Sequence, residues 1–331
     1  MNAKVSGLRE TFGTHTRGFI VALVIAAAAT FLSEHYAAPV MLFALLIGMA
    51  FHFLAEDESC RPGIEFSAKT LLRFGVGLLG LRLSLGDVES LGWVSVLAIV
   101  GFVLATLGCG VLLSTLLGRR SAFGLLAGGS VAICGASAAL AIASVLPKHP
   151  SREEDTLFVV VGVTALSTIA MIAYPILFQA MGMNDLESGF LIGATIHDVA
   201  QVVGAGYSIS DEAGVVATFV KMLRVALLPV VMVVVMVSFR GSQSQKVGLP
   251  GFLVMFVLLA ILANSGLLPD DVIAAVNELS RWCLIVAISA LGVKTSLAKF
   301  LHVRPSYAAI LCVETLFLLL IALAFVKWVG V

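Results

Sequence analysis

The chain has 331 residues, of which 60% are hydrophobic and 12% are charged, with a formal net charge of zero at pH 7. A soluble domain carries about 25% charged residues, so the composition excludes a soluble protein and indicates one that lies in a lipid bilayer. The neutral charge balance gives no reason to expect nucleic acid as a partner. The five cysteines show no CxxC spacing, which argues against a disulfide framework or a zinc site.

Eleven apolar stretches follow one another along the chain, each close to the ~20 residues that span a bilayer as a helix. They lie at 18–34, 39–55, 66–86, 92–117, 122–146, 156–181, 188–208, 214–238, 249–267, 279–299 and 307–329. Open sheets cannot satisfy their backbone in lipid. We therefore predict an all-α polytopic membrane protein with about 11 transmembrane helices.

The first stretch follows a basic segment, as in a signal peptide. Its end, Ser33-Glu34-His35, is a poor cleavage site, so we expect a retained first helix. Basic residues outside the spans gather on the face that holds the N-terminus. The positive-inside rule then places the N-terminus in the cytoplasm and the C-terminus outside.

Three short segments recur in the same order about 150 residues further on, which is typical of a diverged duplication. The matching pairs are 45–52 with 190–197, 71–73 with 222–224, and 131–134 with 286–289. We predict an N-terminal region (1–37) with TM1, a first repeat (38–183, TM2–TM6) and a second repeat (184–331, TM7–TM11). Because five spans per repeat is an odd number, the two repeats should be inverted.

The segment from Ala127 to Ser137 is too rich in glycine for a straight helix. It predicts an unwound stretch, although close packing of small residues is the alternative. By repeat position its counterpart is 287–296, which holds Ser289 and Thr295. Helix N-termini at two such breaks would suit an anion, and the hydroxyls of Ser130, Ser137, Ser289 and Thr295 could complete its shell.

Ionisable residues inside a span are functional candidates. His197, Asp198 and Gln201 lie together in an apolar stretch, with His197 and Gln201 on one helix face. A proton-coupling role for His197 and Asp198 is one hypothesis. A structural hydrogen-bonded pair between two helices is the alternative.

Arg73 and Arg224 occupy equivalent places in the two repeats, and such a pair suits a divalent oxyanion. They could equally reach toward the membrane surface or pair with Asp87, Glu212 or Glu314. We expect Glu314 to be a salt-bridge partner rather than a coupling site.

Four blocks resemble the YeiH-type family of bacterial inner-membrane proteins, which are described as sulfate exporters: 71–83, 133–141, 196–203 and 221–225. Members often carry Glu at the place of Asp198 and a neutral residue at that of Lys294. More distantly, the chain is similar to the superfamily of bile-acid/sodium symporters and sodium/proton antiporters. That resemblance implies a panel and a core, with broken crossing helices at 122–146 and 279–299.

These features favour a secondary active transporter of the elevator type for a small inorganic or sulfonate anion, with sulfate first and protons as the coupling ion. The expected substrate-binding residues are Ser130, Cys134, Gly135, Ser137, His197, Gln201, Arg224, Ser289 and Arg73. No catalytic residue, cofactor or metal is expected, and a homodimer is compatible. A non-transporting sensor or assembly component is the main alternative, and an intramembrane enzyme using His197 and Asp198 is the other.

Overall fold

The computed structural model describes residues 2–36, 40–83, 85–147, 149–239, 250–295 and 305–331. The elements there are helical throughout, which confirms the predicted class. In chain order they are α1 (Asn2–Tyr36), α2 (Val40–Ala50), η1 (His52–Ala55), α3 (Arg61–Phe66), η2 (Ser67–Leu71), α4 (Leu72–Leu78), η3 (Leu79–Arg82), α5 (Leu85–Leu116), α6 (Ser121–Ala132), α7 (Ala136–Val145), α8 (Arg152–Ala180), α9 (Asp185–Thr195), α10 (Val199–Tyr207), α11 (Asp211–Ala226), α12 (Leu228–Ser238), α13 (Gly251–Ala263), α14 (Asp270–Lys294) and α15 (Pro305–Trp328).

Six helices among the described residues are long and apolar enough to cross a membrane. They are His15–Tyr36, Leu91–Leu116, Arg152–Ala180, Asp211–Ser238, Asp270–Lys294 and Tyr307–Trp328. Helix also lies at each of the other predicted spans, but in shorter or composite pieces. The total of eleven crossings and the inverted repeats therefore stay predictions.

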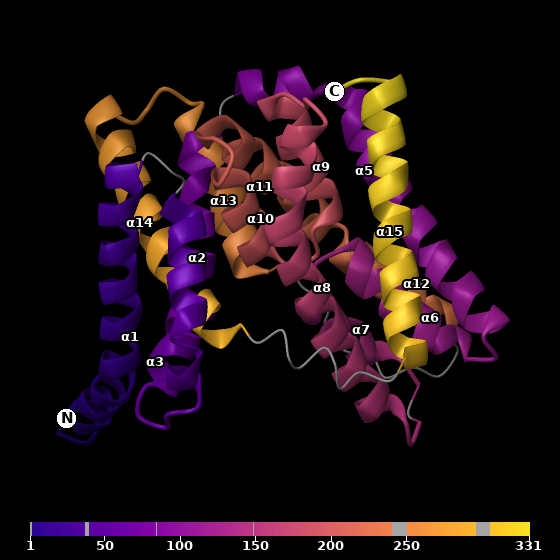
Figure 1. Cartoon of the computed structure of the whole chain (residues 1–331), viewed down its shortest axis with the longest axis horizontal. Helices are drawn as coiled ribbons and strands as arrows, with labels where there is room; N and C mark the ends of the chain where they lie inside the picture. The colour runs from indigo at the N-terminus through magenta and orange to yellow at the C-terminus, as the bar shows by residue number, and fades with distance from the viewer. Residues whose placement is uncertain (1, 37–39, 84, 148, 240–249, 296–304) are drawn as a thin grey trace.

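The helices pack into two groups (Figure 1). We call α1–α4, α13 and α14 the panel, because α14 lies against α2, α4 and η2 while α1 lies against α2 and α3. We call α5–α12 and α15 the core, in which α5 packs on α6 and α11 packs on α9 and α10. The two groups meet chiefly where α10 contacts α2 and α14.

Close glycine contacts allow the panel helices to approach one another. A Cβ placed on Gly48 of α2 would lie 2.9 Å from the Cα of Gly292 in α14 and closer still to the Ser289 carbonyl oxygen. Small residues let helix backbones approach closely in lipid, where packing and not the hydrophobic effect drives association. The panel is thus built as one tightly packed unit.

Candidate functional site

The first helix break lies where the glycine-rich sequence predicts it. Helix α6 ends at Ala132 and α7 begins at Ala136. Gly135, between them, has φ 60° and ψ −126°, a conformation that a residue with a Cβ adopts only under strain. The predicted unwound stretch is therefore present, and it is confined to residues 133–135.

The second break is not where we expected it. Helix α14 is continuous from Asp270 to Lys294, so a discontinuity at 287–294 is wrong. The Ser289 hydroxyl donates to the Ile285 carbonyl and that of Thr295 to Leu291, which satisfies these polar groups locally. Residues 296–299 of the predicted crossing helix lie outside the described residues.

Instead, the chain unwinds at Ile196-His197-Asp198, between α9 and α10. Ile196 is extended, with φ −70° and ψ 139°. Asp198 is the N-cap of α10, and its carboxylate accepts a hydrogen bond from the Ala200 N–H at 3.1 Å. This N-cap pattern was the available sequence signal, since Asp at the start of a helix satisfies a free N–H group.

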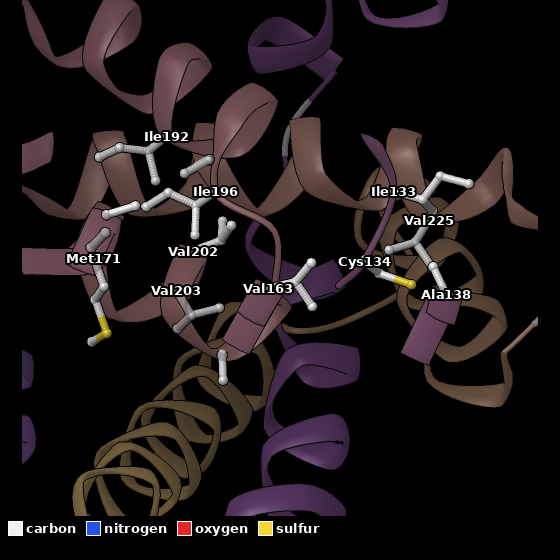
Figure 2. Close-up of a cluster of buried hydrophobic side chains, with 14 of the residues drawn as sticks. Ile133, Cys134, Ala138, Val163, Met171, Ile192, Ile196, Val202, Val203 and Val225 are labelled. Carbon is white, nitrogen blue, oxygen red and sulfur yellow. The ribbon is translucent and has the colours of Figure 1, made fainter. Parts of the chain in front are cut away.

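The two breaks touch each other. A Cβ placed on Gly135 would lie 3.4 Å from the His197 Cβ and 3.7 Å from Val163 of α8. Figure 2 shows the apolar side chains that surround this point, with Ile133 and Cys134 from the first break and Ile196 from the second. The break that meets the first one therefore lies at 196–198, whereas the sequence predicted it at 287–296.

Two buried cations of α11 hold the broken ends together. The Arg224 guanidinium donates to the carbonyl oxygens of Val131 (2.8 Å), Ala132 (2.7 Å), Gly193 (2.9 Å) and Ile196 (2.9 Å). The carbonyls left unpaired at a helix C-terminus carry partial negative charge. A cation placed among them stabilises the ends of both α6 and α9.

Lys221 lies one turn earlier on α11 and does the same. Its ammonium donates to the Ile133 carbonyl at 2.6 Å and to the Ile196 carbonyl at 2.8 Å. Both side chains are almost completely buried. Because four of the five N–H groups of Arg224 are already engaged, this residue serves as a cap for the helix ends rather than as one half of an anion clamp with Arg73.

His197 is fully buried and bound to α15. The Thr315 hydroxyl donates to the Leu311 carbonyl at 2.7 Å, so it accepts from His197 Nε2 at 3.0 Å. Nε2 therefore carries the hydrogen. Nδ1 is buried and makes no hydrogen bond with the residues that the structure describes.

Gln201 links α10 to α8. Its carbonyl accepts from the Ser167 hydroxyl at 3.1 Å, and its amide donates to the Thr168 hydroxyl at 3.2 Å. Ser167 also accepts from the Asp198 N–H at 3.1 Å. These contacts hold Gln201 within the core, as in the structural alternative considered for it.

Asp198 is only partly buried and lies where the core meets the panel. Three cations are within its electrostatic reach: Lys221 of the core, and Arg73 and Lys294 of the panel. Arg73 is exposed on α4, and Lys294 lies 3.8 Å from Glu65. Asp198 therefore feels three positive charges at this junction, of which Lys294 is shared with the Glu65 carboxylate.

The other predicted site residues lie apart from this junction or are satisfied within their helices. Ser130 donates to the Leu126 carbonyl at 2.5 Å, and Cys134 is buried at the first break. Ser137 is exposed on α7, and the backbone carbonyl oxygen of Ser289 lies against Gly48 of α2 within the panel. No group of three or more metal-binding side chains occurs in the described part of the chain.

A polar cavity of about 350 Å³ lies at the far end of α10, between panel and core. It is lined by side chains of both groups, including Arg82, Tyr207, Asp211 and Arg281. Arg82 of η3 and Asp211 of α11 form an ion pair at 2.9 Å that joins the panel to the core. Polar groups between panel and core thus lie at both ends of α10, at Asp198 and at this cavity.

Comparison with known proteins identifies the family. A family model described as "Conserved hypothetical protein 698" matches residues 17–310. A UPF0324 membrane protein of Chlorobaculum tepidum is 47% identical over 336 residues, covering 99% of this chain and 94% of the relative. The chain belongs to the UPF0324 family of membrane proteins. This confirms the resemblance drawn from the four sequence blocks.

Other UPF0324 relatives match with similar coverage. The UPF0324 membrane protein TauZ of Paracoccus denitrificans is 48% identical, covering 91% of each chain. A UPF0324 membrane protein of Rhizobium meliloti is 44% identical, covering 98% of this chain and 96% of the relative. Membership of UPF0324 agrees with the six long apolar helices.

Proposed function

We propose that this UPF0324 protein is a secondary active transporter, and not an enzyme, that carries a small sulfur oxyanion such as sulfate or a sulfonate. The observation that carries the proposal is the group of three cations within electrostatic reach of Asp198, where the chain break before α10 lies beside the panel. Polar and charged residues at membrane depth mark substrate and ion pathways. Broken helices are the usual place for them in transporters.

The anion site that these charges favour lies between Arg73 of the panel and the start of α10 in the core. Arg73 makes no hydrogen bond within the described residues and has five N–H donors in a planar fork, which matches a sulfur oxyanion. Lys294 adds a second positive charge. His197, Gln201, Lys221 and Arg224 act behind this surface by holding the two breaks in place.

Asp198 supplies a reason for proton coupling. Its negative charge repels an incoming anion, and a proton on the carboxyl group removes that repulsion. Anion and proton would then bind together. Movement of the core along the panel would carry both across, which is the elevator mechanism expected from the sequence.

Transport by purified protein in liposomes tests this proposal. We expect uptake of radiolabelled sulfate against internal unlabelled sulfate, and a loss of about tenfold or more in Arg73→Gln, since a loss of ~1.4 kcal/mol in anion binding lowers the affinity tenfold. Lys294→Gln should have a smaller effect, because Lys294 already lies near Glu65.

Arg17→Gln provides the control, because Arg17 is exposed on α1. Its uptake should equal that of the wild type. Absence of uptake for sulfate, sulfite and methanesulfonate would contradict the proposal, as would an Arg73→Gln variant that transports like the wild type.

A further inference from the structure

Glu314 is a carboxyl group buried in the middle of a membrane-spanning helix. It lies on α15 within the span Tyr307–Trp328 and is 0% exposed. Neither carboxyl oxygen has a hydrogen-bond partner within the described residues. The salt bridge that we expected for Glu314 does not form there, so the sequence expectation is wrong.

Glu314 faces the place where α5 and α6 come closest. A Cβ placed on Gly110 of α5 would lie 2.5 Å from Glu314 Oε1 and 2.6 Å from the Gly124 carbonyl oxygen of α6. Any side chain on Gly110 would therefore displace the acid. A carboxyl oxygen and a backbone carbonyl oxygen thus both lie next to the position that a side chain on Gly110 would occupy.

Further oxygen atoms lie at the same helix contact without partners. A Cβ placed on Gly124 would lie 2.7 Å from the Ser114 hydroxyl. The Ser114 and Thr106 hydroxyls are buried and, like Glu314, make no hydrogen bond among the described residues. The contact of α5 with α6 thus holds two hydroxyl groups without partners, one turn to either side of Gly110, where Glu314 of α15 approaches.

No positive side chain of the described chain compensates this acid. No cation of the described residues lies within electrostatic reach of Glu314. The titratable group that does lie within that reach is the Cys109 thiol of α5. His197 of the second break contacts the neighbouring residue Thr315. Asp155 of α8 lies toward the start of α15, where it accepts from the Tyr307 hydroxyl at 2.6 Å.

An ionised carboxylate buried without a donor or a counter-ion is strongly unfavourable. The group therefore needs a positive partner. A proton fits best, because it removes the buried charge and turns the carboxyl group into a hydrogen-bond donor among acceptor oxygens. Backbone carbonyls and hydroxyls could also surround a metal cation, so sodium is the rival that a test must separate.

We propose that Glu314 is a proton-binding site of the core, distinct from Asp198, at which the carboxyl group carries a proton and donates it to a backbone carbonyl at the Gly110–Gly124 contact. A role of this proton site in transport rests on the proposed function, but the presence of a proton on Glu314 does not. When the acid ionises, the proton passes to water, and it returns from water when the acid reforms.

Infrared spectroscopy of the purified protein tests for the proton directly. The wild type should show a carbonyl stretching band of a protonated carboxylic acid that shifts in D2O. The band should be lost in Glu314→Gln, shifted in Glu314→Asp, and kept in Glu56→Gln, a control at an exposed loop position. If Glu314→Gln fails to fold, a shift of the carbonyl band in Glu314→Asp is enough to assign the band to residue 314.

A spectrum that is unchanged in both Glu314 variants would overturn the proposal. So would loss of the wild-type band on addition of sodium, since a metal ion would then be the partner of the carboxylate. In liposomes, Glu314→Gln should keep sulfate exchange but accumulate less sulfate than the wild type under a pH gradient, because Asp198 is then the only one of the two proposed proton sites that remains. If Glu314→Gln accumulates as much sulfate as the wild type, Glu314 has no role in coupling. If the wild type itself does not transport sulfate, the proposed function is refuted, but the infrared evidence for a proton on Glu314 still stands.

Discussion

Arg224 and Lys221 show how single residues make a broken helix possible inside a membrane. Unpaired carbonyl oxygens are costly in lipid, because no water is present to satisfy them. Here two cations replace the missing donors for Val131, Ala132 and Ile133 on one side and for Gly193 and Ile196 on the other. The carbonyls in turn keep the buried charges solvated.

Arg224→Met should therefore destabilise the protein strongly. Removing one partner from a buried charged network typically costs about 3–5 kcal/mol, here through the loss of four hydrogen bonds to carbonyl groups. The measurement is the thermal unfolding midpoint in detergent. Arg281→Met is the control, since the Arg281 side chain is 53% exposed. Equal midpoints for Arg224→Met and the wild type would show that the carbonyl ends need no cation.

Gly135 allows a second test at the scale of one residue. Its positive φ would cost an alanine about 1–3 kcal/mol. Gly135→Ala should lower the unfolding midpoint, whereas Gly101→Ala should not, because nothing surrounds Gly101 within 4 Å. A Gly135→Ala protein as stable as Gly101→Ala would mean that the first break does not need this backbone conformation.

At the scale of the helices, the sequence predicted one break and missed the other for identifiable reasons. Glycines mark the break between α6 and α7, because they weaken a helix wherever they cluster. The break at residues 196–198 holds no glycine, and its polar residues look like one face of a helix. Its stabilising contacts come from α11, more than twenty residues away, and no local pattern reports them.

The prediction of a break at 287–296 in the second repeat was wrong for the opposite reason. Ser289 and Thr295 made that segment polar enough to suggest unwinding. In α14 both hydroxyls donate to carbonyls four residues earlier, which is how serine and threonine are accommodated inside helices. Polarity within an apolar span therefore did not require an interruption.

The contact of α2 with α14 gives a prediction for helix packing. In Gly48→Leu the new side chain would meet the backbone of α14 at Ser289, Gly292 and Val293. We expect the helices to separate and the unfolding midpoint to fall. Gly108→Leu is the matched control, because Gly108 is exposed on α5 with nothing within 4 Å. Similar midpoints for the two variants would contradict the packing described for the panel.

At the scale of the whole molecule, the family resemblance implied a panel and a core, with the 279–299 helix in the core and His197, Gln201 and Arg224 on the panel. The helix contacts also give two groups, but they place α14 with the panel and α10 and α11 with the core, so the membership differs from the expected one. The sequence could not place the residues between the two groups. Arg73 was expected to mirror Arg224, yet one is exposed and the other is buried. Equivalence along the chain did not mean equivalence in the packed structure.

The ion pair of Arg82 with Asp211 lets the relative motion of panel and core be tested. If the core moves, this pair must open. Cysteines at both positions, joined by a bifunctional maleimide, should stop sulfate uptake, while the same reagent should not affect Arg82→Cys or Asp211→Cys separately. Full uptake by the cross-linked protein would show that transport does not separate the groups at this point.

The most direct test of the account is to locate the bound anion itself. Selenate has the shape and charge of sulfate, and its selenium atom gives an anomalous X-ray signal. In crystals soaked with selenate we predict a selenium peak next to the Arg73 guanidinium, facing Asp198 and the start of α10. Peaks only elsewhere on the protein, with the space beside Arg73 empty, would contradict the proposed site.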